Sequence, residues 1–373
     1  MTTATLQSEV RAYVENEGEQ WAELIEREHR VPPALWDELR DRGYLRLAAP
    51  VEFGGAGIPF TRYLELLELF SMSHASLRMI VHVCNGIWRP MEAHANDDQQ
   101  ERFIKPAVAG EIKVAFTLTE PGAGSGADIR CSVVREGDTY YLSGEKHLIT
   151  FGTIADYLMT FARIEGTRGT DGTVALMVPS HGEGIDNREM AETMGVRGTD
   201  HGHIVFDRAP VPVADRFGEE GQGVEIALSG FLGPSRISLA TSCVGLAQRA
   251  LDLALDYAQQ RETFGKKIAE RQAIAFKLAE MATDVEAARR LVIHAATTWE
   301  ERGHAPMEAA MAKLFASEML QRVTDSALQV HGGLGYWSTS PIERVYRDAR
   351  AQRFEEGTAE IQKTTIARDL LKR

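Results

Sequence analysis

The run IAFKLAEMATDVEAARRLVIHA, from Ile274 to Ala295, decides the fold, because its apolar residues recur at alternating intervals of four and three. The residues of this stripe are Ile274, Leu278, Met281, Val285, Ala288, Val292 and Ala295. Side chains at that spacing share one face of an α-helix. The pattern continues to Gly303, so we predict one long bundle helix that ends there.

A second helical stripe precedes the first and consists of Val244, Ala247, Leu251, Leu255 and Ala258. After the first stripe, Pro306 suits the opening turn of a further helix. Short connections between long helices favour antiparallel packing, as in a four-helix bundle. We therefore expect a C-terminal helical bundle domain over residues 224–373.

The N-terminal residues 1–112 also have helical spacing, but in shorter segments. One helix is expected to start at Pro32–Pro33 and to stop at Gly43. A further amphipathic stripe consists of Tyr63, Leu64, Leu67 and Phe70. This part is predicted to be an α-helical domain.

Residues 113–223 differ from both flanks, because short runs of β-branched and aromatic residues alternate with glycine and aspartate. The predicted strands are 114–118, 131–134, 140–142, 157–161, 174–178 and 203–206. Residues 136–138 are expected to form a hairpin turn, and 211–213 to be the exit linker. The predicted fold class is therefore α+β: an N-terminal helical domain, a middle β-sandwich or barrel, and a C-terminal four-helix bundle.

The composition of the chain argues against several classes of partner and of binding site. The chain has 373 residues and a formal net charge of −13, which argues against a nucleic-acid partner because such binding needs a basic surface. No apolar run approaches the roughly 20 residues that span a bilayer, and no targeting segment is visible, so we expect no membrane partner.

The three cysteines are widely separated and form no CxxC pair, as expected of reduced thiols in a cytoplasmic protein. His201 and His203 would share one face of a strand, but no third ligand is evident, so no metal is expected.

Three segments are rich in residues that bring backbone amides or cations to a ligand. They are TEPGAGSG at 119–126, RETFGK at 261–266 followed by Gln272, and QVHGGLGY at 329–336. Glycine lets a ligand approach the backbone, and an arginine at a helix corner can reach a phosphate. Each segment alone is more typical of an ordinary loop or helix cap, and none matches a nucleotide-binding fingerprint.

A fourth segment, FEEGTAE at 354–360, places carboxylates on a glycine-hinged turn before a helix. Glu356 directly precedes the hinge, Gly357, and Glu355 is its competitor for any catalytic role. A carboxylate there could remove a proton from carbon if partial burial raised its pKa towards the working pH.

Together, the four segments resemble the acyl-CoA dehydrogenase family in identity, order and separation, over nearly the whole chain. The resemblance implies the three domains given above and an FAD cofactor between the β domain and the bundle. It also implies that the adenosine half of FAD reaches a neighbouring subunit, so that the protein is an oligomer, most often a homotetramer in this family.

The resemblance carries the family's FAD contacts over to three sets of residues. In the β domain they are Phe116, Leu118, Thr119, Gly124, Ser125, Leu148, Ile149 and Thr150. On the bundle, acting from the adjoining subunit, they are Arg261, Phe264, Gln272, Gln329, Val330, Gly332 and Gly333. Thr358 and Glu360 are expected to contact FAD near the catalytic turn.

The family's reaction removes an α-proton from an acyl thioester while the β-hydrogen leaves as hydride to flavin N5, which gives a trans-2-enoyl thioester. Glu356 matches the family's base, and its amide is expected to polarise the thioester carbonyl. The substrate contacts carried over are Ser125, Gly233, Pro234, Ser235, Arg236 and Gly357. Some relatives place the base at the position of Ser235, but a serine cannot serve in that role. The implied partners are acyl-CoA or another acyl thioester, and an electron-transfer flavoprotein or similar acceptor.

Some positions depart from the family pattern. Gly126 and Leu148 stand where aspartate and tryptophan are usual, which leaves the loop geometry and the wall behind the flavin open. Glu355 replaces a commonly aromatic pocket residue, which argues against a long apolar acyl chain. Arg78 lies one position away from an arginine of relatives with dicarboxylyl substrates.

Two alternatives stay open: a dehydrogenase of a carrier-protein-bound acyl thioester, and a catalytically silent flavin-binding or assembly homologue. A nitroalkane oxidase fits less well, because those relatives carry aspartate at the base position.

Overall fold

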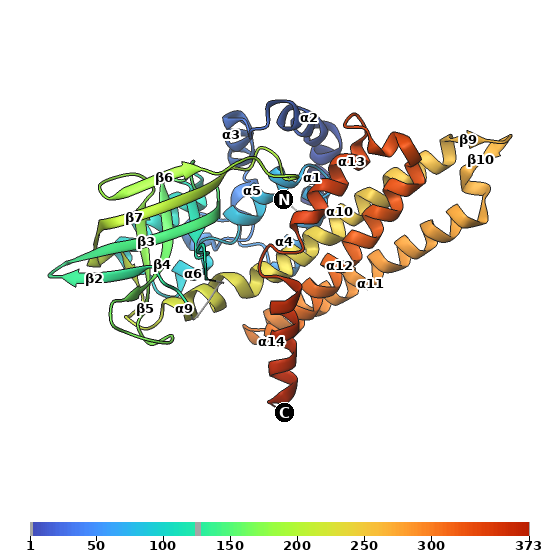
Figure 1. Cartoon of the computed structure of the whole chain (residues 1–373). Helices are drawn as coiled ribbons and strands as arrows, with labels where there is room; N and C mark the ends of the chain where they lie inside the picture. Colours follow the sequence, from blue (N-terminus) through green and yellow to red (C-terminus); the bar gives the residue numbers. More distant parts are fainter. Residues whose placement is uncertain (1–2, 124–127, 373) are drawn as a thin grey trace.

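Helices, a sheet and helices again follow one another in the computed structural model, which describes residues 3–123 and 128–372. Figure 1 shows the sheet at one end of the molecule and the tip of the helical bundle at the other. The N-terminal helices lie between them along one side. The predicted fold class is confirmed.

The N-terminal part is built from short helices, as predicted. They are α1 (Thr3–Tyr13), α2 (Glu19–Glu28), α3 (Pro33–Asp41), α4 (Phe60–Phe70), α5 (Ala75–Cys84), α6 (Arg89–Glu92), α7 (Asp97–Gln99) and α8 (Lys105–Ala109). Helix α3 starts at the second proline of its pair and is followed by Gly43, whose φ of 76° ends the helix. The apolar stripe of α4 is buried.

The middle part is an eight-stranded sheet with the order β6-β7-β3-β2-β4-β5-β8, in which β1 also pairs with β4. Its strands are β1 (Val114–Thr117), β2 (Ser132–Glu136), β3 (Thr139–Thr150), β4 (Tyr157–Ile164), β5 (Thr173–Pro179), β6 (Ile185–Glu189), β7 (His201–Pro212) and β8 (Arg216–Phe217). The hairpin between β2 and β3 is confirmed. Every predicted strand is present, whereas β6 and β8 were not predicted.

The prediction that residues 211–213 form an exit linker is wrong. Val211 pairs with Tyr140 and Pro212 with Thr139, so β7 continues to Pro212 and the chain returns to the sheet as β8. Prolines are tolerated there because β6 pairs only with the Gly202–Phe206 part of β7, which leaves the later part free on that side.

The C-terminal part, residues 223–372, contains three long α-helices and three shorter ones. Its elements are α9 (Gly223–Glu225), α10 (Gly233–Gln260), β9 (Glu262–Thr263), β10 (Lys266–Lys267), α11 (Gln272–Arg302), α12 (Pro306–His331), α13 (Pro341–Ala351) and α14 (Ala359–Leu371). Helix α11 ends at Gly303, which has a φ of 70°, and α12 begins at Pro306, both as predicted. No helix within 3–123 and 128–372 is long and apolar enough to cross a membrane.

Two hydrophobic cores organise the molecule. One is shared by the N-terminal helices and the bundle, and includes Leu67, Phe70, Val244 and Met319. The other lies under the sheet and includes residues of the segment before it, such as Phe103. The N-terminal helices therefore pack into both cores.

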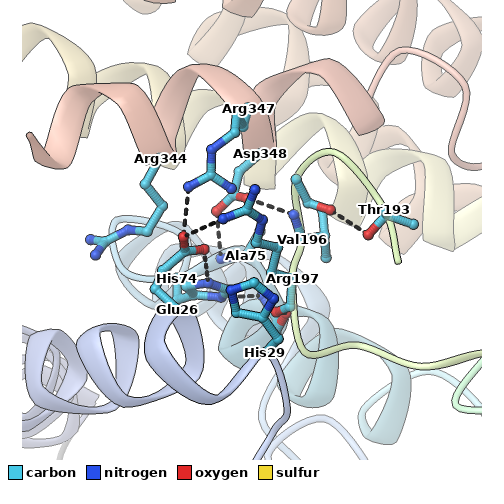
Figure 2. Close-up of polar contacts among 12 residues, drawn as sticks. Glu26, His29, His74, Ala75, Thr193, Val196, Arg197, Arg344, Arg347 and Asp348 are labelled. Atoms are coloured by element: carbon cyan, nitrogen blue, oxygen red, sulfur yellow. Dashed lines mark hydrogen bonds and ion pairs between the residues drawn. The ribbon is translucent and has the colours of Figure 1, made fainter. Parts of the chain in front are cut away.

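A polar cluster joins α2, α13 and the loop before β7 (Figure 2). Arg347 donates to Glu26 over 2.6 Å, and His74 Nε2 lies 3.1 Å from the same carboxylate. Asp348, which is 1% exposed, accepts the Val196 amide at 2.6 Å and the Ala75 amide at 3.3 Å. This cluster fixes α13, the helix that leads into the turn at Glu356, against the N-terminal helices.

Candidate active site

Glu356 lies in the turn between α13 and α14, with a φ of 55°. The next residue, Gly357, has a φ of 95°, and a Cβ there would lie 3.1 Å from Gln362 Nε2. Two consecutive residues with positive φ bend the chain sharply, and glycine adopts such a φ without steric strain. The amide of Glu356 has no acceptor among the described residues and is available to a ligand.

The carbonyl groups of this turn are held by three side chains. Lys313, fully buried on α12, donates to the carbonyls of Arg353 (2.8 Å) and Gly357 (2.7 Å). Gln362 donates to the carbonyls of Glu356 and Gly357, both at 3.1 Å, and Arg236 Nε donates to the Glu356 carbonyl at 3.3 Å. The turn is thus fixed from α10, α12 and α14 together.

The carboxylate of Glu356 has the proton affinity of a general base. Burial raises its pKa to about 7, opposed by a hydrogen bond from Ser235 and reinforced by the nearby charge of Glu355. Arg236 and Lys313 favour the ionised form. A base with a pKa near neutrality accepts a proton effectively at physiological pH.

Ser235 connects Glu356 to a histidine that the sequence analysis did not single out. The Nε2 of His82, on α5, lies 2.8 Å from Ser235 Oγ. His82 is 4% exposed, and burial, together with the Arg78 cation, lowers its pKa to about 3, so it is neutral. The signal in the sequence is weak, because a histidine in a largely apolar helix, which here also carries Ser76 and Arg78, is common in protein cores.

Glu355, the competitor for the role of base, is already paired. Both terminal nitrogens of Arg78 donate to one of its oxygens, over 3.2 and 3.3 Å, and Arg78 is 1% exposed. Arg78 is therefore an internal counter-ion, and its guanidinium is not free to bind a dicarboxylyl substrate in this arrangement.

A buried ion pair holds the segment after β1, at Leu118–Glu120, in place. Lys146 Nζ donates to the Leu118 carbonyl at 2.9 Å and to Glu120 at 2.8 Å, and neither charged side chain is more than 4% exposed. Glu120 also accepts the amides of Arg130 and Cys131. The backbone on both sides of Thr119 is thereby held in place. Gly124 and Ser125 lie outside the described residues.

Leu148, Ile149 and Thr150 form the end of β3, beside this segment. The His147 amide donates to the Thr119 carbonyl over 3.0 Å. Leu148 has a φ of 57° and is 54% exposed, whereas Ile149 is buried. Phe116, on β1, stacks on Phe231 at 4.2 Å between ring centres. An exposed leucine beside glycine-rich backbone is a surface that a planar ring could cover.

The bundle residues assigned to the cofactor lie at the other end of the molecule. β9 and β10 form the tip of the bundle, far from the sheet (Figure 1). There, Tyr257 stacks on His331 at 4.5 Å, which places the end of α12 beside the end of α10. Of the assigned residues, the exposed ones are Arg261, Phe264, Gln272, Gln329, Gly332 and Gly333, and Val330 is buried.

The structure thus brings together Glu356, Gly357, Ser235 and Arg236, with Gly233 and Pro234 in the first turn of α10. Thr358 and Glu360 are exposed at the start of α14, next to this turn. Within one chain it does not bring the residues of the bundle tip to the segment at Leu118–Thr119. His203 lies 3.3 Å from Glu145, and the described residues contain no group of three or more potential metal ligands.

Comparisons with known proteins agree with this arrangement. Sequence profiles of the N-terminal, middle and C-terminal domains of acyl-CoA dehydrogenase match residues 2–111, 115–209 and 221–371. The chain is 35% identical to the caffeyl-CoA reductase-Etf complex subunit CarC of Acetobacterium woodii, over 94% of this chain and 92% of that protein. It is also 35% identical to the mitochondrial short-chain specific acyl-CoA dehydrogenase of Bos taurus, over 100% and 90%. The solved structure of butyryl-CoA dehydrogenase from Megasphaera elsdenii superimposes with a TM-score of 0.93 at 30% identity, covering 100% of this chain and 99% of that one.

Proposed function

The chain belongs to the acyl-CoA dehydrogenase family, and we propose that it carries out the α,β-dehydrogenation of an acyl thioester with Glu356 as the base. The observation that carries this assignment is the half-buried Glu356 carboxylate, on a turn that Arg236 and Gln362 hold by its carbonyl and with a pKa raised to about 7. Glu355 is not the base, because its carboxylate is neutralised by Arg78.

The cofactor of this flavin-dependent oxidoreductase is proposed to be FAD, which accepts the hydride when bound. The described residues fit it: Leu148 offers an exposed apolar side chain, and the buried pair of Lys146 and Glu120 fixes the neighbouring backbone. Phe116, Leu118, Thr119, Ile149 and Thr150 are proposed to complete the flavin side of the site.

The chain's own groups provide the proton chemistry. Glu356 accepts the α-proton, and its own amide donates to the thioester carbonyl, where negative charge grows as that proton leaves. Arg236, Lys313 and Gln362 keep the amide and the carboxylate in position by holding the carbonyls of the turn.

The substrate is proposed to be a short-chain acyl-CoA. A charged pair, Arg78 and Glu355, lies next to the base, and a long apolar chain would gain nothing by contact with it. The names of the bovine and Megasphaera relatives point the same way. A carrier-protein-bound thioester is the alternative substrate.

The protein is proposed to be a homotetramer, with the tip of each bundle completing the FAD site of another subunit. Phe264 is 99% exposed, Tyr336 83% and Trp337 66%, which is unusual for aromatic side chains that meet no partner. An electron-transfer flavoprotein is proposed as acceptor, since the Acetobacterium relative is named as part of an Etf complex. The three free cysteines are consistent with a reducing compartment such as the cytoplasm.

Anaerobic titration tests the function. The purified protein should be yellow, and butyryl-CoA should bleach its long-wavelength flavin absorbance faster than dodecanoyl-CoA does. A colourless protein that cannot be reconstituted with FAD would support a silent homologue. A yellow protein that no CoA ester bleaches would favour a carrier-protein substrate, tested with the same acyl groups on a phosphopantetheinylated carrier. Arg261→Ala should weaken FAD retention and assembly, and unchanged affinity would contradict the role of the bundle tip.

A further inference from the structure

Three side chains from distant segments, His82, Ser235 and Glu356, interact in that order, and the last of them is the proposed base. His82 Nε2 lies 2.8 Å from Ser235 Oγ. The Ser235 hydroxyl acts on Glu356 as a hydrogen-bond donor that lowers the pKa of its carboxylate. His82 and Ser235 are 4% and 5% exposed, so water does not compete freely for these contacts.

The proton count fixes the direction of this chain. An ionised carboxylate only accepts hydrogen bonds, so the single proton of Ser235 must point to Glu356. The Ser235 oxygen then accepts from His82, which requires the tautomer with its proton on Nε2. The opposite direction would leave the serine unable to donate to the base.

The other ring nitrogen supports this tautomer. His82 Nδ1 is buried and has no protein partner among the described residues. His82 and Ser235 help to line a small cavity of about 10 Å³, which has room for one water molecule that could donate to Nδ1. Asn85, Arg89 and Ser238 also line it.

We propose that His82 is a positioning residue for the base: acting through Ser235, it fixes the hydrogen bond that orients the Glu356 carboxylate and favours its ionised form. This inference rests on the proposed role of Glu356. Because His82 is neutral, it acts through the direction of a hydrogen bond rather than through charge.

Other charged groups around the chain set the background against which this effect is measured. Glu355, Arg236 and Lys313 act on Glu356, and Arg78 acts on His82. Tyr63 and Arg89 face the same cavity, with the Arg89 guanidinium 5.0 Å from the ring centre of Phe60. None of these is changed in the variants below.

The test is the acidic limb of the pH profile of kcat/KM. Ser235→Ala should move its midpoint up by about one pH unit, since a hydrogen bond to a charged group is lost. His82→Phe should move it in the same direction by a smaller amount, and His82→Gln, whose amide can donate to Ser235, should restore it. The double variant His82→Phe/Ser235→Ala should match Ser235→Ala alone.

Ser238→Ala is the matched control, because it removes a hydroxyl from the same helix and the same cavity but makes no side-chain contact with Glu356 in the described structure. Its midpoint should not move. An unshifted midpoint in His82→Phe, or shifts that add in the double variant, would overturn the proposal.

A second readout does not need turnover. The difference in unfolding temperature between each background and its Glu356→Gln derivative titrates with the folded-state pKa of Glu356. It should shift upward in His82→Phe, as the kinetic limb does. If wild-type flavin is not bleached by any thioester but this titration shifts, the proposed function fails and the hydrogen-bonded chain stands. If the flavin is bleached and the titration does not shift, the inference alone fails.

Discussion

Arg78 donates to Glu355 through both of its terminal nitrogens, at 3.2 and 3.3 Å, so the acidic residue beside the base is neutralised inside the protein. Two carboxylates at adjacent positions repel each other, and without this guanidinium the second negative charge would oppose ionisation of the first. The two glutamates therefore differ in their surroundings: Glu355 is held in an ion pair, whereas Glu356 is left as the proposed base.

Replacing Arg78 should thus change the base without touching it. Arg78→Met leaves the Glu355 charge unopposed, and the acidic limb of kcat/KM should move up by about one pH unit or more. The double variant Arg78→Met/Glu355→Gln should return the limb to its wild-type position. A limb that stays in place in Arg78→Met would show that Glu355 does not act on the base.

Glu356→Gln should lower kcat by about 10²–10⁴-fold, because proton transfer contributes a factor of that order. FAD content should be unchanged.

The same substitution should increase the free energy of unfolding above neutral pH. The pKa of Glu356 in the folded protein, about 7, lies above the ordinary value of 4.5, so the wild-type protein loses stability as the pH rises from about 4.5 to about 7. At pH 8 the variant should be more stable than wild type by at most about 3 kcal/mol, as measured by denaturant titration.

Lys313→Met should loosen the catalytic turn. It removes the ammonium group that donates to the carbonyls of Arg353 and Gly357. The Gly357 carbonyl keeps its bond from Gln362, but the Arg353 carbonyl loses its donor among the described residues, and a buried acceptor without a partner costs about 1–3 kcal/mol. Both the free energy of unfolding and kcat should fall. Lys363→Met is the control, because the Lys363 side chain is exposed and its ion pair with Glu318, at 3.9 Å, is long. Full kcat in Lys313→Met would mean that Gln362 and Arg236 alone hold the turn.

The cluster at Glu26 should contribute to acid stability. Burial raises the pKa of this carboxyl, but hydrogen bonds from His74 and Arg347 outweigh it and lower the pKa to about 2. The stabilisation is therefore complete above about pH 4.5 and is lost as pH falls through about 2, by up to about 3 kcal/mol.

Glu26→Gln should lack this pH dependence, whereas Glu23→Gln, at an exposed position on the same helix, should retain it. Unfolding followed by circular dichroism between pH 6 and 2 measures the difference. Parallel curves for wild type and Glu26→Gln would contradict the role of the cluster.

The sequence was sufficient for the helices, because they depend on local patterns, whereas the role of Glu356 was inferred from the resemblance to the family and stays a prediction. The stripe from Met281 to Ala295 marks the buried face of α11 directly. The glycine after Glu356 marks the turn that carries the proposed base. Strands β6 and β8 were missed because they are short and have few buried residues.

The side chains that support the site could not be predicted in the same way. Lys146, Lys313 and His82 are polar residues within buried segments, and their partners lie 28, 44 and 153 positions away. Spacing along a helix or strand tells which face a residue occupies, but not which distant carbonyl or hydroxyl that face meets. The site roles and the domain boundaries stay predictions for the experiments above.

Asp348 has a consequence well beyond the loop that it binds. It lies eight residues before the base, on the helix whose last turn leads directly to it, and it grips two backbone amides of other segments. A substitution that disturbs these two contacts would shift α13, which ends at Ala351, five residues before the proposed base. Substitutions near Ala75, far from Glu356 in sequence, should therefore lower the activity, although they change no residue that is proposed to contact the thioester.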